Sequence, residues 1–237
     1  VSPALPGPAP PGLGGPATAA PRYSSGPTTL KMAAMILGVL LTAVSRVALH
    51  MLDPADGPRH RRFLPSRWWS IGGLDALVIA VLAVAGLIEA GEDNAPGWIV
   101  TVVACLLLWT LTEYVLHRFV LHHIPYIKDL HDRHHVEERS SVGTPTWLSL
   151  GVHALVAFFP VWMISGFAAA SAVSCGLMLG YLWYISVHHM IHHWHPSHPS
   201  YLYTLKRRHA VHHHVDETVN FGVTSIFWDR VFGTARL

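Results

Sequence analysis

Four apolar stretches constrain the fold of this chain more than any other feature. Each is close in length to the ~20 residues that cross a bilayer as a helix. Hydrophobic residues make up 51% of the sequence and charged residues only 13%. The charged fraction is about half the ~25% that is usual for soluble domains. We therefore expect an all-α integral membrane protein with four transmembrane helices, which lie near residues 71–90, 97–116, 147–168 and 170–190.

Two segments of different composition precede these stretches. Residues 1–30 are rich in Pro, Gly and Ala, and we expect a disordered tail because they hold too few large apolar side chains to bury. Residues 31–70 contain a further apolar stretch, 33–52, that Arg46 interrupts. An arginine inside a span is costly, so an interfacial helix and an extra membrane helix both remain open, followed by a basic linker. The third domain is then 71–237.

The positions of the basic residues predict how the chain is oriented. The loops at 91–96 and 165–171 contain no Lys or Arg. Of the 16 Lys and Arg residues, 13 precede the first stretch closely, lie between the second and third, or follow the fourth. By the positive-inside rule those three segments face the cytoplasm. The stretches therefore form two hairpins that enter from the cytoplasmic side and return to it. The net charge of +2 and the scattered basic residues do not favour nucleic-acid binding.

Ten of the 19 histidines fall into four short groups at the cytoplasmic ends of these stretches. Residues three and four apart share a helix face, so each of the two His-x-x-His-His triplets should point three imidazoles in one direction. Ten nitrogens exceed what one ion can use, which predicts a dinuclear metal site. The candidate ligands are His117, His122, His131, His134, His135, His188, His192, His209, His212 and His213.

The composition of this ligand set points to a class of chemistry. Imidazole suits iron, zinc, copper and nickel. The sequence contains neither the Glu-x-x-His repeats of soluble di-iron bundles nor the His-Glu-x-x-His motif of zinc proteases. An all-nitrogen pair of metals in an apolar setting favours O2 activation on a lipid over hydrolysis of a soluble substrate. The predicted metal is therefore iron.

The remaining histidines have other expected roles. A helical neighbour of a ligand points about 100° away from it, which predicts contacts around the ligands or with solvent. His193 could exchange roles with His192 if that helix is distorted. His153 is expected to be a packed or substrate-side residue. His50 and His60 are expected at the interface, His195 and His198 in a proline-containing loop, and the helical neighbours are His123, His189, His193 and His214.

Five segments occur in a recognisable order: WTLTEYVLHRFVLHH (109–123), LHDRHH (130–135), YISVHHMIHH (184–193), LKRRHAVHHH (205–214) and FGVTSIFWDRVFGT (221–234). Together they resemble the membrane fatty acid hydroxylase superfamily, which includes fatty acid 2-hydroxylases, sterol desaturases and sterol C4-methyl oxidases. The resemblance extends over residues 71–237. The first and last histidine boxes are most similar to those of the 2-hydroxylase branch.

The resemblance implies a cytoplasmic helical cap in which the ten histidines hold two irons, which zinc can replace on purification. It also implies hydroxylation of a C–H bond of a lipid or fatty acyl chain, with O2 as co-substrate. No His-Pro-Gly-Gly motif of a fused cytochrome b5 occurs, so we expect a separate ferredoxin, cytochrome or reductase as electron donor. The Ala, Gly and Pro bias suggests a bacterial source, and hence the plasma membrane.

Two acidic residues are candidates for a supporting role. Glu113 lies one turn before His117 and could accept a proton from a ligand imidazole, as could Asp229. Structural pairs with Arg118 and Arg230 are equally open. Two alternative functions also remain: a desaturase or a sterol or carotenoid hydroxylase with the same centre, and a non-catalytic metal-binding membrane scaffold.

Overall fold

Apart from Val1, the computed structural model describes residues 66–138 and 145–237. The chain within these ranges is helical and contains no strand, which confirms the predicted all-α class for this part. The expected tail, the stretch 33–52, His50 and His60 lie outside the described residues. The elements are α2 (Ser66–Val115), the π-helix η2 (Leu116–Leu121), α3 (Pro125–Val136), α4 (Thr146–His153), the π-helix η3 (Ala154–Phe158), α5 (Phe159–His193), α6 (Tyr201–His214) and α7 (Phe227–Val231).

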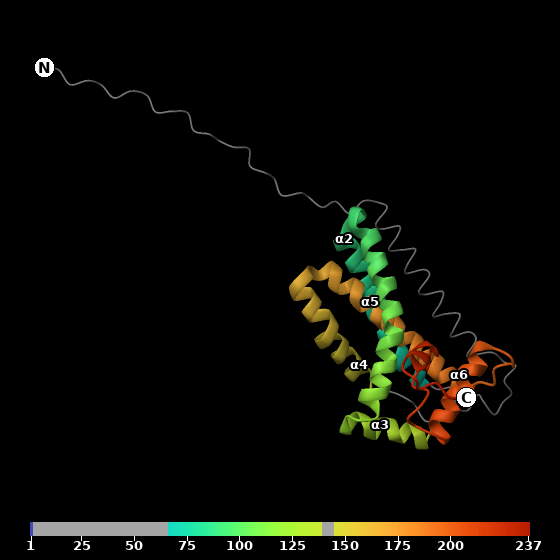
Figure 1. The fold of residues 1–237 in the computed structure, drawn as a ribbon. Coiled ribbons are helices and arrows are strands. Elements are labelled where there is room, and N and C mark those ends of the chain that lie inside the picture. The colour runs from blue at the N-terminus through green and yellow to red at the C-terminus, as the bar shows by residue number, and fades with distance from the viewer. Residues whose placement is uncertain (2–65, 139–144) are drawn as a thin grey trace.

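Two helical segments, Gly72–Leu121 and Thr146–His193, are long and apolar enough to cross a membrane. Each contains a glycine with a non-helical backbone, Gly91 (φ 71°) in α2 and Gly166 (φ 83°) in α5. Glycine adopts this left-handed region without a steric penalty, so the chain can reverse there. The two halves on either side of each glycine run back along each other (Figure 1). The predicted loops at 91–96 and 165–171 thus contract to sharp turns, and residues 92–96 are helical.

Small residues bring α2 and α5 into close contact. A Cβ atom on Gly180 would lie 2.3 Å from the Cβ of Trp109, and one on Gly176 would lie 2.4 Å from the Val102 carbonyl oxygen. Neither glycine can be enlarged without displacing the neighbouring helix, as is common where membrane helices cross. The second half of α2 therefore runs beside the second half of α5. The π-helix η2 that follows α2 carries His117, and α5 ends at His193.

Large apolar side chains remain exposed along the long helices. They include Val100, Leu107, Leu155, Met163 and Ile164, each more than 60% exposed. A soluble monomer rarely leaves so much apolar surface in water, whereas a lipid environment would cover it. At one end of the bundle, the short helices α3 and α6 gather beside the ends of α2 and α5 (Figure 1).

Candidate metal centre

The ten predicted histidines come together at this end of the bundle, and they form two groups of five. Within each group, one nitrogen from each imidazole lies within 4.8 Å of those from the other four. The first group, named here the His117 group, contains His117, His122, His131, His135 and His212. The second, named the His134 group, contains His134, His188, His192, His209 and His213. The groups adjoin, since the rings of His135 and His213 stack with centroids 4.1 Å apart.

Each His-x-x-His-His triplet is divided between the two groups. On α3, His131 and His135 are four residues apart and enter the His117 group, while His134 enters the other. On α6, His209 and His213 enter the His134 group, and His212 crosses to the first. Residues four apart lie almost above one another, whereas a residue three along is offset to the other side. The expectation that each triplet points one way is thus refined: each contributes to both groups.

A π-helix aligns the first histidine pair. His117 and His122 are five residues apart, which in a regular α-helix would place them about 140° apart around the axis. The segment Leu116–Leu121 is instead a π-helix, whose i→i+5 hydrogen bonds bring residues five apart onto one face. The two rings stack with centroids 5.3 Å apart and an interplanar angle of 17°. Both imidazoles therefore reach the same group.

The closest nitrogen pairs have spacings that suit metal ligands. In the His117 group the Nε2 atom of His131 lies 3.1 Å from the Nε2 atoms of both His117 and His135. In the second group the Nε2 atom of His209 lies 2.9 Å from those of His188 and His192. The single proton that an Nε2 atom can carry cannot form hydrogen bonds to two such nitrogens at once, so hydrogen bonding alone does not explain these spacings. Two nitrogens at right angles on one metal, each about 2.0–2.1 Å from it, are roughly 3 Å apart.

Burial favours the neutral form of the clustered histidines on α3 and α6, as His212 and His134 illustrate. Desolvation lowers the pKa of His212 to about 3; the hydrogen bond that His212 donates to the Val219 carbonyl opposes this shift, and repulsion from His135 adds to it. Desolvation and repulsion from His135 likewise lower the pKa of His134 to about 3. A metal ligand must offer an unprotonated nitrogen. The residues present therefore fit a pair of bound transition-metal ions.

Backbone carbonyls contact two ligands of the His117 group from behind. The Nδ1 atom of His117 lies 2.6 Å from the carbonyl oxygen of Phe221, and that of His212 lies 2.8 Å from the carbonyl oxygen of Val219. A carbonyl can only accept, so Nδ1 carries the proton in both rings and Nε2 offers its lone pair.

The proposed contact between Glu113 and a ligand imidazole is corrected by this geometry. Both Glu113 oxygens accept hydrogen bonds from Thr224, Oε1 from its backbone N–H at 2.8 Å and Oε2 from its hydroxyl at 2.7 Å. The side chain lies on the face of α2 that meets the C-terminal segment. Arg118 is not its partner, because that guanidinium donates to the hydroxyl of Tyr114. Glu113 thus ties the C-terminal segment to α2.

Asp229 also acts on the backbone instead of on an imidazole. Its Oδ1 atom accepts from the Phe221 N–H at 2.9 Å, and its Oδ2 atom accepts from the Gly222 N–H at 3.0 Å. Its nearest cation is Arg208, at 3.9 Å, and not Arg230. Asp229 therefore affects His117 indirectly: it accepts from the Gly222 N–H, and the Phe221 carbonyl of the same peptide group contacts His117.

A third carboxylate near the ligands was not predicted from the sequence. Glu138 lies just beyond α3, with Oε2 3.7 Å from Nδ1 of His192 and Oε1 2.7 Å from Nε2 of His214. Its spacing of four from His134 would be suggestive on a helix, but α3 ends at Val136. The loop at 219–221, whose carbonyls contact His117 and His212, was not predicted either, because any residue type can supply a backbone carbonyl.

The other histidines that the structure describes lie outside both groups, as predicted. His189 stacks on His193 at 4.2 Å, while His192 and not His193 joins the ligand cluster. His153 packs against Trp109 at 6.1 Å and contacts the Ser149 carbonyl through Nδ1. The loop between α5 and α6 contains His195 and His198.

Comparison with known proteins identifies the family. The sequence profile described as fatty acid hydroxylase matches residues 102–234, a range that includes all ten histidines. The chain belongs to the fatty acid hydroxylase family. A dihydroceramide fatty acyl 2-hydroxylase of Arabidopsis thaliana is 32% identical over 182 residues, which cover 70% of this chain and 73% of that protein. The solved hydroxylase domain of Scs7p has a TM-score of 0.62 and 26% identity, covering 72% of this chain and 67% of that one.

The N-terminal part of this fatty acid hydroxylase family member has a second similarity. A profile described as mycobacterial cell wall arabinan synthesis protein matches residues 26–126. A probable arabinosyltransferase C of Mycobacterium bovis is 64% identical over 97 residues, which are 41% of this chain. The chain spans only 9% of the length of that protein. The matched profile range contains two of the ten clustered histidines, so this similarity does not account for the metal centre.

Proposed function

We propose that this protein is a membrane-bound, O2-dependent hydroxylase that converts a C–H bond of a lipid or fatty acyl chain into an alcohol. The observation that carries the proposal is the pair of adjoining five-histidine groups at the end of two long apolar helices. The names of the hydroxylase relatives support the substrate class. The ten histidines would hold two iron ions, five imidazoles around each.

Iron bound there would supply the activation of O2, with one oxygen atom inserted into the C–H bond and the other reduced to water. The protein contributes a set of buried, neutral nitrogens held from several helices at once. Aromatic side chains line the bundle next to them: Tyr184 lies 5.5 Å from the His188 ring, and Trp109 packs against both Tyr181 and Tyr184. These rings would exclude water and present an apolar wall to an acyl chain.

The proposed topology places this centre on the cytoplasmic side. The glycine turns at Gly91 and Gly166 divide the two long helical segments, Gly72–Leu121 and Thr146–His193, into four parts that form two hairpins, each part of spanning length. The basic residues beside α3 and α6 favour the cytoplasm for the opposite end. A separate ferredoxin, cytochrome or reductase would deliver electrons to this exposed cap.

The test combines product analysis with isotopic oxygen. Membranes containing the full chain, supplied with an electron donor and 18O2, should yield a lipid that carries one 18O atom in a new hydroxyl group. His134→Ala should abolish the product, while His123→Ala, at an exposed histidine outside both groups, should retain it. Hydroxylation that survives in His134→Ala would refute the proposal.

The same experiment separates the alternatives. A product that has lost two hydrogens and gained no oxygen would indicate a desaturase. Bound metal without any lipid product, with each class of electron donor, would favour a metal-binding scaffold. An oxidised sterol or carotenoid in place of an acyl chain would redirect the substrate assignment.

A further inference from the structure

The two histidine groups differ in how their ligands are held from behind. In the His117 group, His117 and His212 donate to carbonyls of one loop, at 2.6 Å and 2.8 Å. In the His134 group, the Nδ1 atoms of His134, His209 and His213 are buried without a hydrogen-bond partner among the described residues. The loop 219–222 therefore orients His117 and His212 of the first group, whereas no carbonyl of the described residues does the same for His134, His209 and His213.

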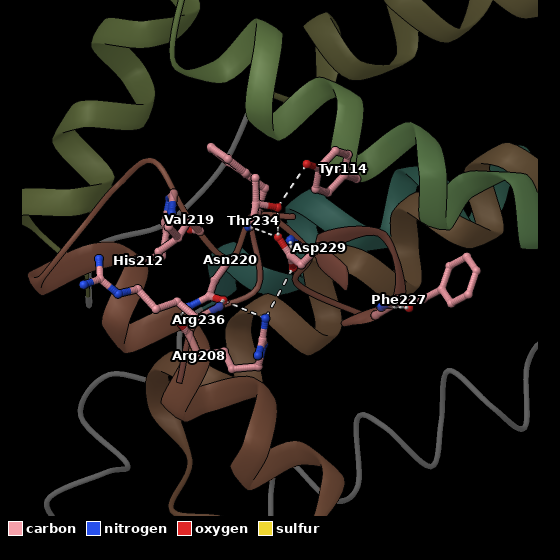
Figure 2. A network of polar contacts seen from close by, with 12 residues as sticks. Tyr114, Arg208, His212, Val219, Asn220, Phe227, Asp229, Thr234 and Arg236 are labelled. Atoms are coloured by element: carbon pink, nitrogen blue, oxygen red, sulfur yellow. Dashed lines mark hydrogen bonds and ion pairs between the residues drawn. The ribbon is translucent and has the colours of Figure 1, made fainter. Parts of the chain in front are cut away.

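A single residue lies between the two carbonyls. Asn220 is fully buried and has a φ of 56°, a left-handed conformation that asparagine tolerates better than most residues. Its Oδ1 atom accepts from Arg208 at 2.6 Å and from the backbone N–H of Arg236 at 2.8 Å. Its backbone N–H donates to the Thr234 carbonyl at 2.9 Å. The residue between the two carbonyls is thus fastened to α6 and to the C-terminal segment (Figure 2).

Asp229 fixes the other side of the loop. Its two oxygens accept the N–H groups of Phe221 and Gly222, and Oδ1 also accepts from the Thr234 hydroxyl at 2.8 Å. That hydroxyl lies 3.0 Å from the hydroxyl of Tyr114 on α2 (Figure 2). A Cβ atom on Gly222 would lie 2.1 Å from the Ser225 carbonyl oxygen, so the loop also requires glycine there.

We propose that Asn220 and Asp229 are positioning residues for one metal only, the one that the His117 group holds. They keep the Val219 and Phe221 carbonyls against the Nδ1 atoms of His212 and His117, so that both Nε2 lone pairs face the metal. This inference rests on the metal centre of the proposed function. Loss of an outer partner of a ligand typically weakens metal binding about 10–100-fold. Asp229→Asn and Asn220→Gly should produce that loss at one of the two positions.

The experiment measures metal per chain in the full-length protein, purified in detergent and equilibrated with graded concentrations of a chelator. Wild-type protein should retain two metals. Asp229→Asn removes one acceptor oxygen, and Asn220→Gly removes the side chain but still permits the positive φ. Each should release one metal at roughly 10–100-fold lower chelator strength and keep the second unchanged. Asp216→Asn is the matched control, since Asp216 lies in the same connection but faces Thr218 and Arg236.

Double variants identify which metal is lost. Combined with His209→Ala, which removes a ligand of the His134 group, Asp229→Asn should leave no metal at intermediate chelator strength. Combined with His212→Ala it should leave one. Equal loss of both metals, with or without unfolding, or retention of both with wild-type affinity in Asp229→Asn and Asn220→Gly, would overturn the inference. Failure of the metal centre itself would look different, because the single variants His209→Ala and His212→Ala would then leave the metal content unchanged.

Discussion

Replacement of Glu113 by alanine and by glutamine distinguishes a tether for the C-terminal segment from a proton acceptor for a ligand. Alanine leaves two buried donors of Thr224, the backbone N–H and the hydroxyl, without their acceptors. Each unsatisfied buried donor costs about 1–3 kcal/mol, so the local loss is roughly 2–6 kcal/mol. Glutamine can still accept from the N–H through its oxygen and donate to the hydroxyl through its amide, so the change should be small.

Hydrogen exchange at the Thr224 amide reports this difference. Because each ~1.4 kcal/mol changes an equilibrium constant tenfold, a loss of about 2 kcal/mol or more predicts exchange roughly 30-fold faster, or more, in Glu113→Ala. Glu113→Gln should retain near-native protection and two metals per chain. The reasoning is refuted if Glu113→Gln loses a metal while the Thr224 amide stays protected, since that would place the carboxylate in contact with an imidazole.

Three further outcomes follow from the packing and the centre. His134→Ala should release one of two metals and abolish lipid oxidation without loss of helix content, measured by metal analysis, product analysis and circular dichroism; two retained metals would contradict it. Gly180→Ala should lower stability by about 1–3 kcal/mol, because its Cβ would overlap Trp109, while Gly97→Ala, with open space around it, should not; thermal unfolding decides, and equal midpoints would contradict the packing. In chelated protein, the folded-state pKa values of His134 and His212 are about 3, below the value of about 6.5 in the unfolded chain. The stability that these two neutral histidines contribute is therefore fully present above about pH 6.5 and is lost as pH falls below it. Each of these two histidines should lower the free energy of unfolding by roughly 2 kcal/mol at pH 5 relative to pH 7. Equal unfolding midpoints at the two pH values would contradict this.

The sequence alone determined the helical class and the residues of the candidate centre. Apolar stretches of spanning length have one dominant solution, because helices satisfy every backbone hydrogen bond internally in lipid. Histidines three and four apart share a face whatever the tertiary context. Eight of the ten candidate ligands have these spacings, His117 and His122 are five apart, and all ten cluster in the structure. The turns near residues 91 and 166 could likewise be placed from composition, although their short length could not.

The tertiary structure decided how those histidines are divided and what holds them. Spacing along a helix defines a shared face, but whether His134 and His212 each join the opposite group depends on how α3 and α6 lie against α2 and α5. The π-helix at Leu116–Leu121 changes the direction of His117 relative to His122, and local sequence does not predict such a change of register. Glu113 accepts from Thr224, 111 positions away, and Glu138 faces His192 on α5. Asp229 accepts from backbone N–H groups 7 and 8 positions away. Such contacts form only when segments that are separate in the sequence pack together. Histidine spacing in the sequence therefore predicted the ligands, but the residues and carbonyls that orient them could be identified only from the tertiary structure.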